Sequence, residues 1–511
     1  MIEKILGSVF CSYAQKRFRQ IQETYTSPLD LQERNLKKIL QKSKETVFGR
    51  KFDFKSIKSI ADYQKRIPLT SYEKMKPWVD GCLEGKPDYI WPGRIKYFAL
   101  TSGTTSGSSK YIPVSSDVIR ENKKAALDSI LFYLANTKDR SLFNGKILFL
   151  GGSTSLKSMP NGLRAGDMSG ILSKFTPFYI SSCQEPRRDL IILSDWEEKV
   201  KRVIEDVRKK DVRLICGLPP WLLVFFDHLL EREGKRHVSE IWPNLSLFIY
   251  GGLDFSPYRK LMKDIIGKDI YYMETYFASE AFMGIQDIPS SEDAHERGIL
   301  LMLDYGIFYE FIEAEDVTKD NPRRYTVSDV KTDVNYAIAV TNVNGLYSYL
   351  IGDTVKFVSR APLRIRVTGR IEDFLSVAGE HVIDEEIEYA ISQAVLRQGG
   401  IVSNYTVAPY YPPHKKGRPG HQWLIEFLEL PQDLNKFAEA IDRVLCDKND
   451  DYREHRRRDF CMSAPSIYKL KEGTFYKWHK KRDQLGGQHK TPHLRNNRSI
   501  AKELIELDSG L

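Results

Sequence analysis

Hydrophobic positions follow three successive patterns along the 511 residues of the chain. The first ninety residues place apolar side chains at helical spacing between charged faces, and they predict short helices on either side of Pro68. From about residue 97, short buried strands alternate with helices, as in residues 117–136, 146–152, 212–231 and 245–252. This alternation predicts an α/β fold with a largely parallel sheet and ligand chemistry at the strand ends.

The pattern becomes antiparallel after Gly298. "AIAVTNVNGLYSYLIGDTVKFV" (337–358) has two β-rich runs around Asn344-Gly345, which is typical of a hairpin. We expect a hinge in "TGRIEDFLSV" (368–377), and beyond it the pattern predicts a small α+β unit with helices over 384–396 and 434–447 and strands over 404–411, 421–430 and 465–470. The prediction is therefore a large N-terminal domain (1–372) with parallel or mixed sheets and a β-rich subdomain, followed by a mobile C-terminal lid (373–511).

Composition narrows the class of protein. The hydrophobic fraction of 41% is ordinary for a globular chain, and the net charge of +9 arises from 77 basic against 68 acidic residues. This small excess does not call for a nucleic-acid partner, and we interpret "REHRRRDF" (453–460) as a solvated basic helix face. The six cysteines are scattered without CxxC spacing, and no apolar run approaches the ~18 residues that span a bilayer. We expect a cytoplasmic protein without membrane association, acting as a monomer.

The stretch "TSGTTSGSSK" (101–110) sets many hydroxyl groups beside one lysine. It is not a P-loop, because Lys110 comes three residues after the second glycine, whereas GxxxxGK[ST] requires direct succession. A solvated linker and a phosphate-binding loop are both compatible with this composition. The apolar, β-rich flanks favour a rigid hairpin, in which amides near Gly103 and Gly107 could form an anion-binding nest.

Three later stretches present polar residues next to predicted strands: "METYFASEA" (273–281), "YLIGDTVKF" (349–357) and "TGRIEDFLS" (368–376). Taken singly, each has an ordinary interpretation, such as a helix N-cap at Ser279 or a turn aspartate at Asp353. Their order along one chain, after the hydroxyl-rich stretch, is the informative feature.

The ordered set TSGTTSGSSKYIP, YFASE, YLIGD and R-x-x-D-F-L-S-V resembles the acyl acid-amido synthetases of the auxin-responsive (Gretchen Hagen) family, which lies within the acyl-adenylate-forming superfamily. The resemblance extends over essentially the whole chain, to "GGQHKTPHL" (486–494). The stretch around YFASE departs from the family pattern at Phe277, where the family usually has a small residue, and at Ala281, where it often has glycine. The resemblance implies a C–N bond-forming ligase that activates a carboxylic acid as acyl-AMP, releases pyrophosphate, and transfers the acyl group to the amine of an amino acid.

The resemblance also implies the roles of individual residues. Lys490, above the α-phosphate, and Glu280, as the Mg²⁺ ligand, would be catalytic, Asp353 would bind the ribose, and Asp373 would be the hinge. The ATP or AMP site would comprise Ser102, Gly103, Thr104, Thr105, Ser106, Lys110, Tyr276, Ala278, Ser279, Asp353 and Arg370. His381 stands where plant relatives carry a lysine, and we assign it no catalytic role.

The acyl pocket is expected beside the helix that follows the hydroxyl-rich stretch. Its candidates are Asn122, Ala125, Ala126 and Phe277, with an apolar wall from Trp221, Leu222 and Phe225, although ordinary helix packing explains these residues equally well. An acyl-CoA ligase and a non-catalytic acyl-acid binding protein are the alternative functions. A pure sensor would have no use for a Mg²⁺ carboxylate, which favours the enzyme.

Overall fold

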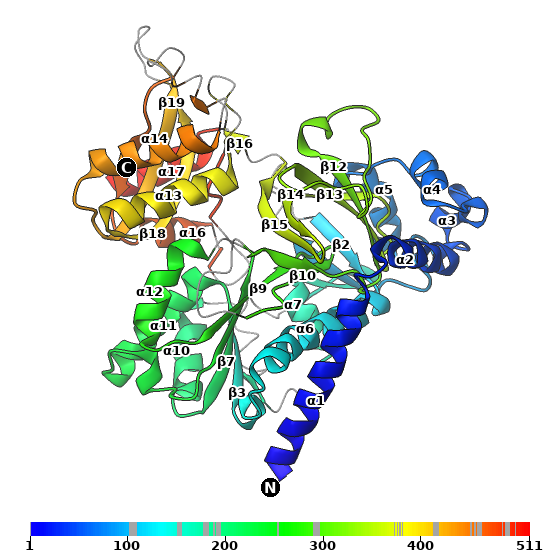
Figure 1. Cartoon of the computed structure of the whole chain (residues 1–511), viewed down its shortest axis with the longest axis horizontal. Coiled ribbons are helices and arrows are strands. Elements are labelled where there is room, and N and C mark those ends of the chain that lie inside the picture. The colour runs from blue at the N-terminus through cyan, green and yellow to red at the C-terminus, as the bar shows by residue number, and fades with distance from the viewer. Residues whose placement is uncertain are drawn as a thin grey trace. The chain divides into compact units, whose positions relative to one another are not determined.

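The computed structural model describes the chain apart from residues 1, 102–109, 151–155, 177–182, 188–189, 191–195, 253–254, 290–296, 372–373, 376, 378–379, 381, 412–417, 450–451, 454–455, 457–461, 483, 486–490, 496 and 511. Two compact units make up the chain (Figure 1). Unit 1 comprises residues 1–252 and 266–366, and unit 2 comprises residues 253–265 and 367–511. The domain boundary expected between residues 372 and 373 stays a prediction.

The N-terminal part of unit 1 is helical, as its apolar spacing predicts. It contains α1 (Ile2–Glu23), α2 (Pro28–Ser43), α3 (Val47–Lys51), α4 (Ile60–Arg66) and α5 (Tyr72–Leu83). A capping box between Ser59 and Asp62 starts α4, and the chain leaves the helix before Pro68, which confirms the predicted break. Among the described residues, none of the helices combines the length and apolar content needed to cross a bilayer.

Within the described residues, the main sheet of unit 1 has eleven strands in the order β12-β13-β14-β15-β11-β10-β9-β8-β7-β3-β6. Its parallel part consists of β3 (Lys146–Leu150), β6 (Gln184–Glu185), β7 (Val212–Gly217), β8 (Leu247–Gly251) and β9 (Tyr271–Phe277). The helices α10 (Trp196–Val207), α11 (Pro219–Glu233) and α12 (Ser256–Ile266) separate these strands along the chain. The predicted alternation of strand and helix is confirmed.

The pairing changes from parallel to antiparallel between β9 and β10 (Phe282–Ile285). The sheet continues through β11 (Ile299–Leu301), β15 (Leu363–Arg370), β14 (Tyr349–Arg360), β13 (Asn335–Asn342) and β12 (Ile307–Glu313). The hairpin expected around Asn344-Gly345 is the β13–β14 pair. The α/β class with a mixed sheet is therefore confirmed.

A second sheet supports the hydroxyl-rich stretch. Its order is β2 (Lys110–Val114), β1 (Tyr97–Thr101), β5 (Arg164–Gly166) and β4 (Lys157–Ser158). β1 and β2 are antiparallel, and their last pair is Thr101 opposite Lys110, so residues 102–109 connect the strands of a hairpin. The rigid flanks expected from the sequence are thus confirmed. The chain then enters α6 (Ser116–Thr137), and α7 (Met168–Ser173) follows β5.

An apolar core joins the N-terminal helices to this second sheet. Phe48, Tyr63, Phe98, Ile112 and Tyr347 are all fully buried within one cluster, and the rings of Phe48 and Tyr347 stack with centroids 4.6 Å apart. Because Tyr347 lies in the β13–β14 connection, this core also fixes the segment that leads into β14.

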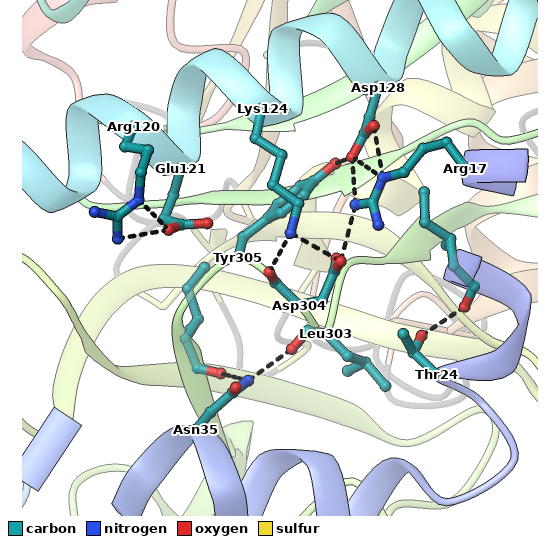
Figure 2. Close-up of polar contacts among 12 residues, drawn as sticks. Arg17, Thr24, Asn35, Arg120, Glu121, Lys124, Asp128, Leu303, Asp304 and Tyr305 are labelled. Carbon is teal, nitrogen blue, oxygen red and sulfur yellow. Dashed lines mark hydrogen bonds and ion pairs between the residues drawn. The ribbon is translucent and has the colours of Figure 1, made fainter. Parts of the chain in front are cut away.

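A buried ion network links α1 and α6 to the β11–β12 connection (Figure 2). Arg17 donates from Nε to Asp128 Oδ1 over 2.9 Å, from Nη2 to Asp128 Oδ2 over 2.6 Å, and from Nη2 to Asp304 Oδ2 over 2.8 Å. Lys124 Nζ lies 2.9 Å from Asp304 Oδ2, and the Tyr305 hydroxyl donates to Asp128 Oδ2 over 2.9 Å. The charges are therefore mutually paired, as buried charges must be.

Unit 2 is an α+β unit. It contains β16 (Phe374–Leu375), β17 (Val382–Ile383), α13 (Asp384–Gln398), β18 (Ile401–Tyr410), β19 (Gly420–Glu429), α14 (Leu434–Lys448), β20 (Ser466–Leu470), α16 (Thr474–Lys481) and α17 (Ser499–Ser509). From α13 to β20 the order of helices and strands matches the prediction, and α17 was not predicted. The solvated-face interpretation is wrong at Arg456, whose guanidinium pairs with both carboxylate oxygens of Asp442 over 2.7 and 2.6 Å.

Candidate nucleotide and acyl site

The YFASE motif forms the turn of the β9–β10 hairpin. The Ala278 N–H donates to the Ala281 carbonyl over 2.9 Å, and the rings of Phe277 and Phe282 lie 5.2 Å apart on the two sides of the turn. Glu280 is buried in this turn. The segment is a strand-to-strand turn, so the alternative of a helix N-cap at Ser279 is excluded.

Two residues that the sequence placed in the nucleotide site contact each other. The Tyr276 hydroxyl on β9 donates to Asp353 Oδ2 on β14 over 2.8 Å, and both side chains are buried. A hydrogen bond to an ionised carboxylate is stronger than one between neutral groups. It fixes Asp353 within reach of the β9–β10 turn, although the two residues are 77 positions apart.

A bulge in β14 lies at this meeting point. On β13 and β14, Ala337 pairs with Thr354 while Ala339 pairs with Leu350, so β14 carries two extra residues in this interval. Gly352 lies in the interval with a φ of +98°, a conformation that other residues rarely adopt. Bulges of this kind disrupt the regular ladder of a strand, and Asp353 lies in this interval.

Asn342 and Asn344 connect the separate segments of the site, and the sequence reasoning missed both. Asn342 Nδ2 donates to the Glu280 carbonyl over 2.8 Å, and Asn344 Oδ1 accepts the Ser115 N–H over 3.1 Å. Ser115 directly follows β2 and caps α6, with its Oγ accepting the Val118 N–H over 3.0 Å. The N-V-N spacing before a glycine is the only sequence signal, and a turn explains it equally well.

The acyl-pocket candidates differ in exposure. Asn122 and Ala125 on α6 are buried, Phe277 is half-buried, and Ala126 is exposed. Asn122 Nδ2 lies 4.0 Å from Met168 Sδ at the start of α7, so this face of α6 packs against α7. These positions fit ordinary packing as well as pocket lining, and their role stays a prediction.

The apolar wall expected on α11 lies in the core of unit 1. Leu222 and Phe225 are fully buried, and Phe225 stacks on Trp242 with centroids 6.5 Å apart. Core packing therefore accounts for both side chains.

Of the remaining predicted residues, Lys110 and Arg370 are described, and the others lie outside the described residues. Lys110 Nζ lies 5.6 Å from the ring centroid of Tyr72, whose hydroxyl accepts the Tyr111 N–H over 2.9 Å. Arg370 is exposed at the end of β15 and belongs to unit 2. Outside the described residues lie Ser102, Gly103, Thr104, Thr105, Ser106, Asp373, His381 and Lys490.

A pair of opposite charges, half-buried Asp167 and buried Lys199, lies where β5 ends. β5 runs parallel to β1 with Gly166 opposite Ala99, so Asp167 follows β5 where β1 approaches residues 102–109. Burial raises the pKa of Asp167 to about 6 and lowers the pKa of Lys199 to about 8, and each charge partly offsets the shift of the other. Such perturbed groups concentrate at functional sites, and no sequence motif marks these two residues.

The donor chemistry fits Mg²⁺ bound chiefly through a nucleotide. Among the described residues, no three His, Cys, Asp or Glu side chains gather into a metal-binding group. Mg²⁺ in nucleotide enzymes is held by one or two carboxylates plus substrate phosphates, and Glu280 can supply such a carboxylate.

Family models match most of the chain: the N-terminal domain model of the GH3 family matches residues 17–218, the central domain model residues 300–370, and the C-terminal domain model residues 385–499. The chain belongs to the GH3 family. This confirms the resemblance drawn from the ordered motifs.

Named relatives and solved structures align with nearly the whole of this GH3 chain. The indole-3-acetic acid-amido synthetase GH3.3 of Arabidopsis thaliana is 20% identical over 90% of this chain and 88% of its own length. The jasmonoyl–L-amino acid synthetase JAR4 of Nicotiana attenuata is 23% identical over 88% and 87%. Among solved structures, AtGH3.15 acyl acid amido synthetase in complex with 2,4-DB has a TM-score of 0.78 at 17% identity, covering 97% of this chain and 96% of that one. A 2-hydroxyisobutyryl-CoA ligase in its postadenylation state has a TM-score of 0.58 at 14% identity, covering 93% and 91%.

Proposed function

We propose that the chain is an acyl acid-amido synthetase, the activity for which its GH3 relatives are named. A carboxylate oxygen of the acid attacks the α-phosphorus of ATP, and pyrophosphate leaves. The nitrogen of an amino acid then attacks the acyl carbon, AMP leaves, and the amine loses a proton. The observation that supports this most directly is the buried Tyr276–Asp353 hydrogen bond beside the Glu280 turn.

The proposal gives each part of the site a task. Asp353, held by Tyr276, would accept hydrogen bonds from the ribose hydroxyls. Glu280 would hold Mg²⁺, which neutralises phosphate charge when bound. Since two anions must be brought together, positioning and charge neutralisation should supply most of the rate.

The segments outside the described residues complete the proposal. The hydroxyls of residues 102–106 would hold phosphates, Lys110 would close that loop, and Lys490 would reach the α-phosphate during adenylation only. Rotation of a lid about Asp373 would then admit the amine. A monomeric, cytoplasmic enzyme that uses ATP with Mg²⁺ is part of this proposal.

The fold similarity to 2-hydroxyisobutyryl-CoA ligase keeps a CoA ligase as a second candidate. The two functions share adenylation and differ in the acceptor. ATP–pyrophosphate exchange should be measured with a panel of carboxylic acids, and the products should then be weighed by mass spectrometry with amino acids or CoA as acceptors. An acyl-amino acid product supports the proposal, and an acyl-CoA product alone would refute it.

Variants tie the activity to the predicted residues. Glu280→Gln and Lys490→Ala should both abolish exchange without unfolding the chain. Glu185→Gln is the matched control, because Glu185 is also a buried carboxylate of unit 1 but is paired with Lys210 over 2.9 Å in a region without site motifs. An equal loss of exchange in this control would contradict the assigned role of Glu280.

A further inference from the structure

The connection between β13 and β14 lies between two segments of the proposed site. On one side, Asn342 Nδ2 donates to the Glu280 carbonyl, while Asn342 Oδ1 accepts the Asn344 N–H over 3.0 Å. The Nδ2 donor of Asn342 therefore has an acceptor, and its Oδ1 acceptor has a donor. Asn342 is buried, so these bonds are shielded from competing water.

The other side of the connection holds the start of α6. Asn344 Oδ1 accepts the Ser115 N–H, and Ser115 Oγ donates to the Val343 carbonyl over 2.6 Å. Ser115 is the first residue after β2, the exit strand of the hydroxyl-rich hairpin. A short chain of buried hydrogen bonds thus runs from this hairpin through Asn344 and Asn342 to Glu280.

The bond at Glu280 acts on the carboxylate through the backbone. Its acceptor is the carbonyl of Glu280 itself, which is bonded to the same Cα as the side chain. Fixing this peptide plane restricts the direction in which the carboxylate leaves the backbone, in a turn of only four residues between β9 and β10. A displacement of about 1 Å at a reacting centre can cost about 100-fold in rate.

We propose that Asn342 is a positioning residue that sets the Glu280 carboxylate relative to the end of β2 and the start of α6. This inference rests on the proposed function, in which Glu280 holds Mg²⁺. It assigns Asn342 no contact with substrate. Its effect is to tie the proposed metal-binding carboxylate to the end of β2 and the start of α6.

The test compares Asn342→Ala with a matched control, Asn35→Ala. Asn35 is also buried and donates from Nδ2 to a backbone carbonyl, that of Leu303, over 2.7 Å, but it contacts the β11–β12 connection (Figure 2). The two variants should lose similar amounts of melting temperature. Asn342→Ala should in addition lower kcat/KM for ATP in pyrophosphate exchange by about 10- to 100-fold, and it should raise the Mg²⁺ concentration needed for half-maximal rate. Asn35→Ala should leave both within about twofold of wild type. Equal effects in the two variants would overturn the proposal.

A second variant separates the two bonds of the Asn342 amide. Asn342→Asp keeps the acceptor for the Asn344 N–H and loses the donor to Glu280. If the proposal holds, Asn342→Asp should lose as much kcat/KM as Asn342→Ala does. Wild-type kinetics in Asn342→Asp would refute the proposal.

Hydrogen exchange distinguishes failure of this inference from failure of the proposed function. If wild-type protein shows no exchange with any acid, the proposed function fails, but amide exchange at residues 278–281 still tests the positioning. Faster exchange there in Asn342→Ala, with no change in Asn35→Ala, supports the inference. Unchanged protection in both variants would overturn it.

Discussion

Replacing Asp128 with asparagine should strongly destabilise unit 1. Asp128 is 2% exposed and accepts hydrogen bonds from Nε and Nη2 of Arg17 and from the Tyr305 hydroxyl. The substitution keeps the shape of the side chain but removes its charge, and it turns an NH₂ group toward one of these donors. Removing one partner of a buried ion pair costs about 3–5 kcal/mol. Because Arg17 retains Asp304 at 2.8 Å, we expect the lower end, about 3 kcal/mol.

Urea unfolding followed by circular dichroism measures this loss. Tyr305→Phe is the graded comparison, because it removes a single hydrogen bond to the carboxylate and should cost about 1.5 kcal/mol. Arg17→Met combined with Asp128→Leu removes both charges of the closest pair, while Asp304 keeps Lys124 at 2.9 Å. The double variant should therefore lose less than the sum of its single changes. A loss below about 1 kcal/mol for Asp128→Asn, or strict additivity in the double variant, would refute the reasoning.

Three further predictions concern the site and unit 2. Tyr276→Phe should weaken ATP binding by about tenfold or more, measured by calorimetry, because the proposed ribose ligand loses a charge-assisted hydrogen bond; unchanged affinity would contradict the role of this bond. Gly352→Ala should weaken ATP binding because its φ of +98° disfavours alanine, whereas Gly93→Ala, at a φ of +81° in equally open space, should destabilise without changing affinity. Burial lowers the pKa of His421, whose Nε2 lies 2.8 Å from Glu380. The unfolded chain therefore takes up this proton at a higher pH than the folded chain does, and the free energy of unfolding should fall as pH drops below about 6.5. His421→Gln should flatten this pH dependence in urea titrations at pH 7.5 and 5.5.

Local chemistry made much of the fold predictable. β3 begins at Lys146 and α13 at Asp384, as the sequence pattern predicts, because apolar periodicity and flanking turn residues mark these elements within a few positions. The flanks of the hydroxyl-rich stretch were predictable for the same reason, since "YFAL" and "YIPV" read as strands without knowledge of their partners.

The contacts between distant segments could not be predicted in this way. The Tyr276–Asp353 bond depends on a bulge, and strand periodicity contains no information about an inserted pair of residues. From the sequence, Asn342 looks like part of an ordinary turn, because its partner Glu280 lies 62 positions earlier. The basic neighbours of Arg456 predict a solvent-exposed side chain. The carboxylate of Asp442 that pairs with it lies on another helix, so the sequence does not show the pair.

The candidate site therefore combines two ways of placing a side chain. Glu280 follows β9, the last parallel strand, at the carboxyl end where α/β sheets collect their ligands. Asp353 lies inside the antiparallel strand β14 rather than at a strand end, within its bulged interval, and it accepts a hydrogen bond from the Tyr276 hydroxyl on β9. A strand end tolerates small changes in register, whereas a one-residue slip in a strand reverses which face each side chain occupies. The β14 bulge is consequently the more fragile of the two devices, and the Tyr276–Asp353 hydrogen bond is the contact that ties it to β9.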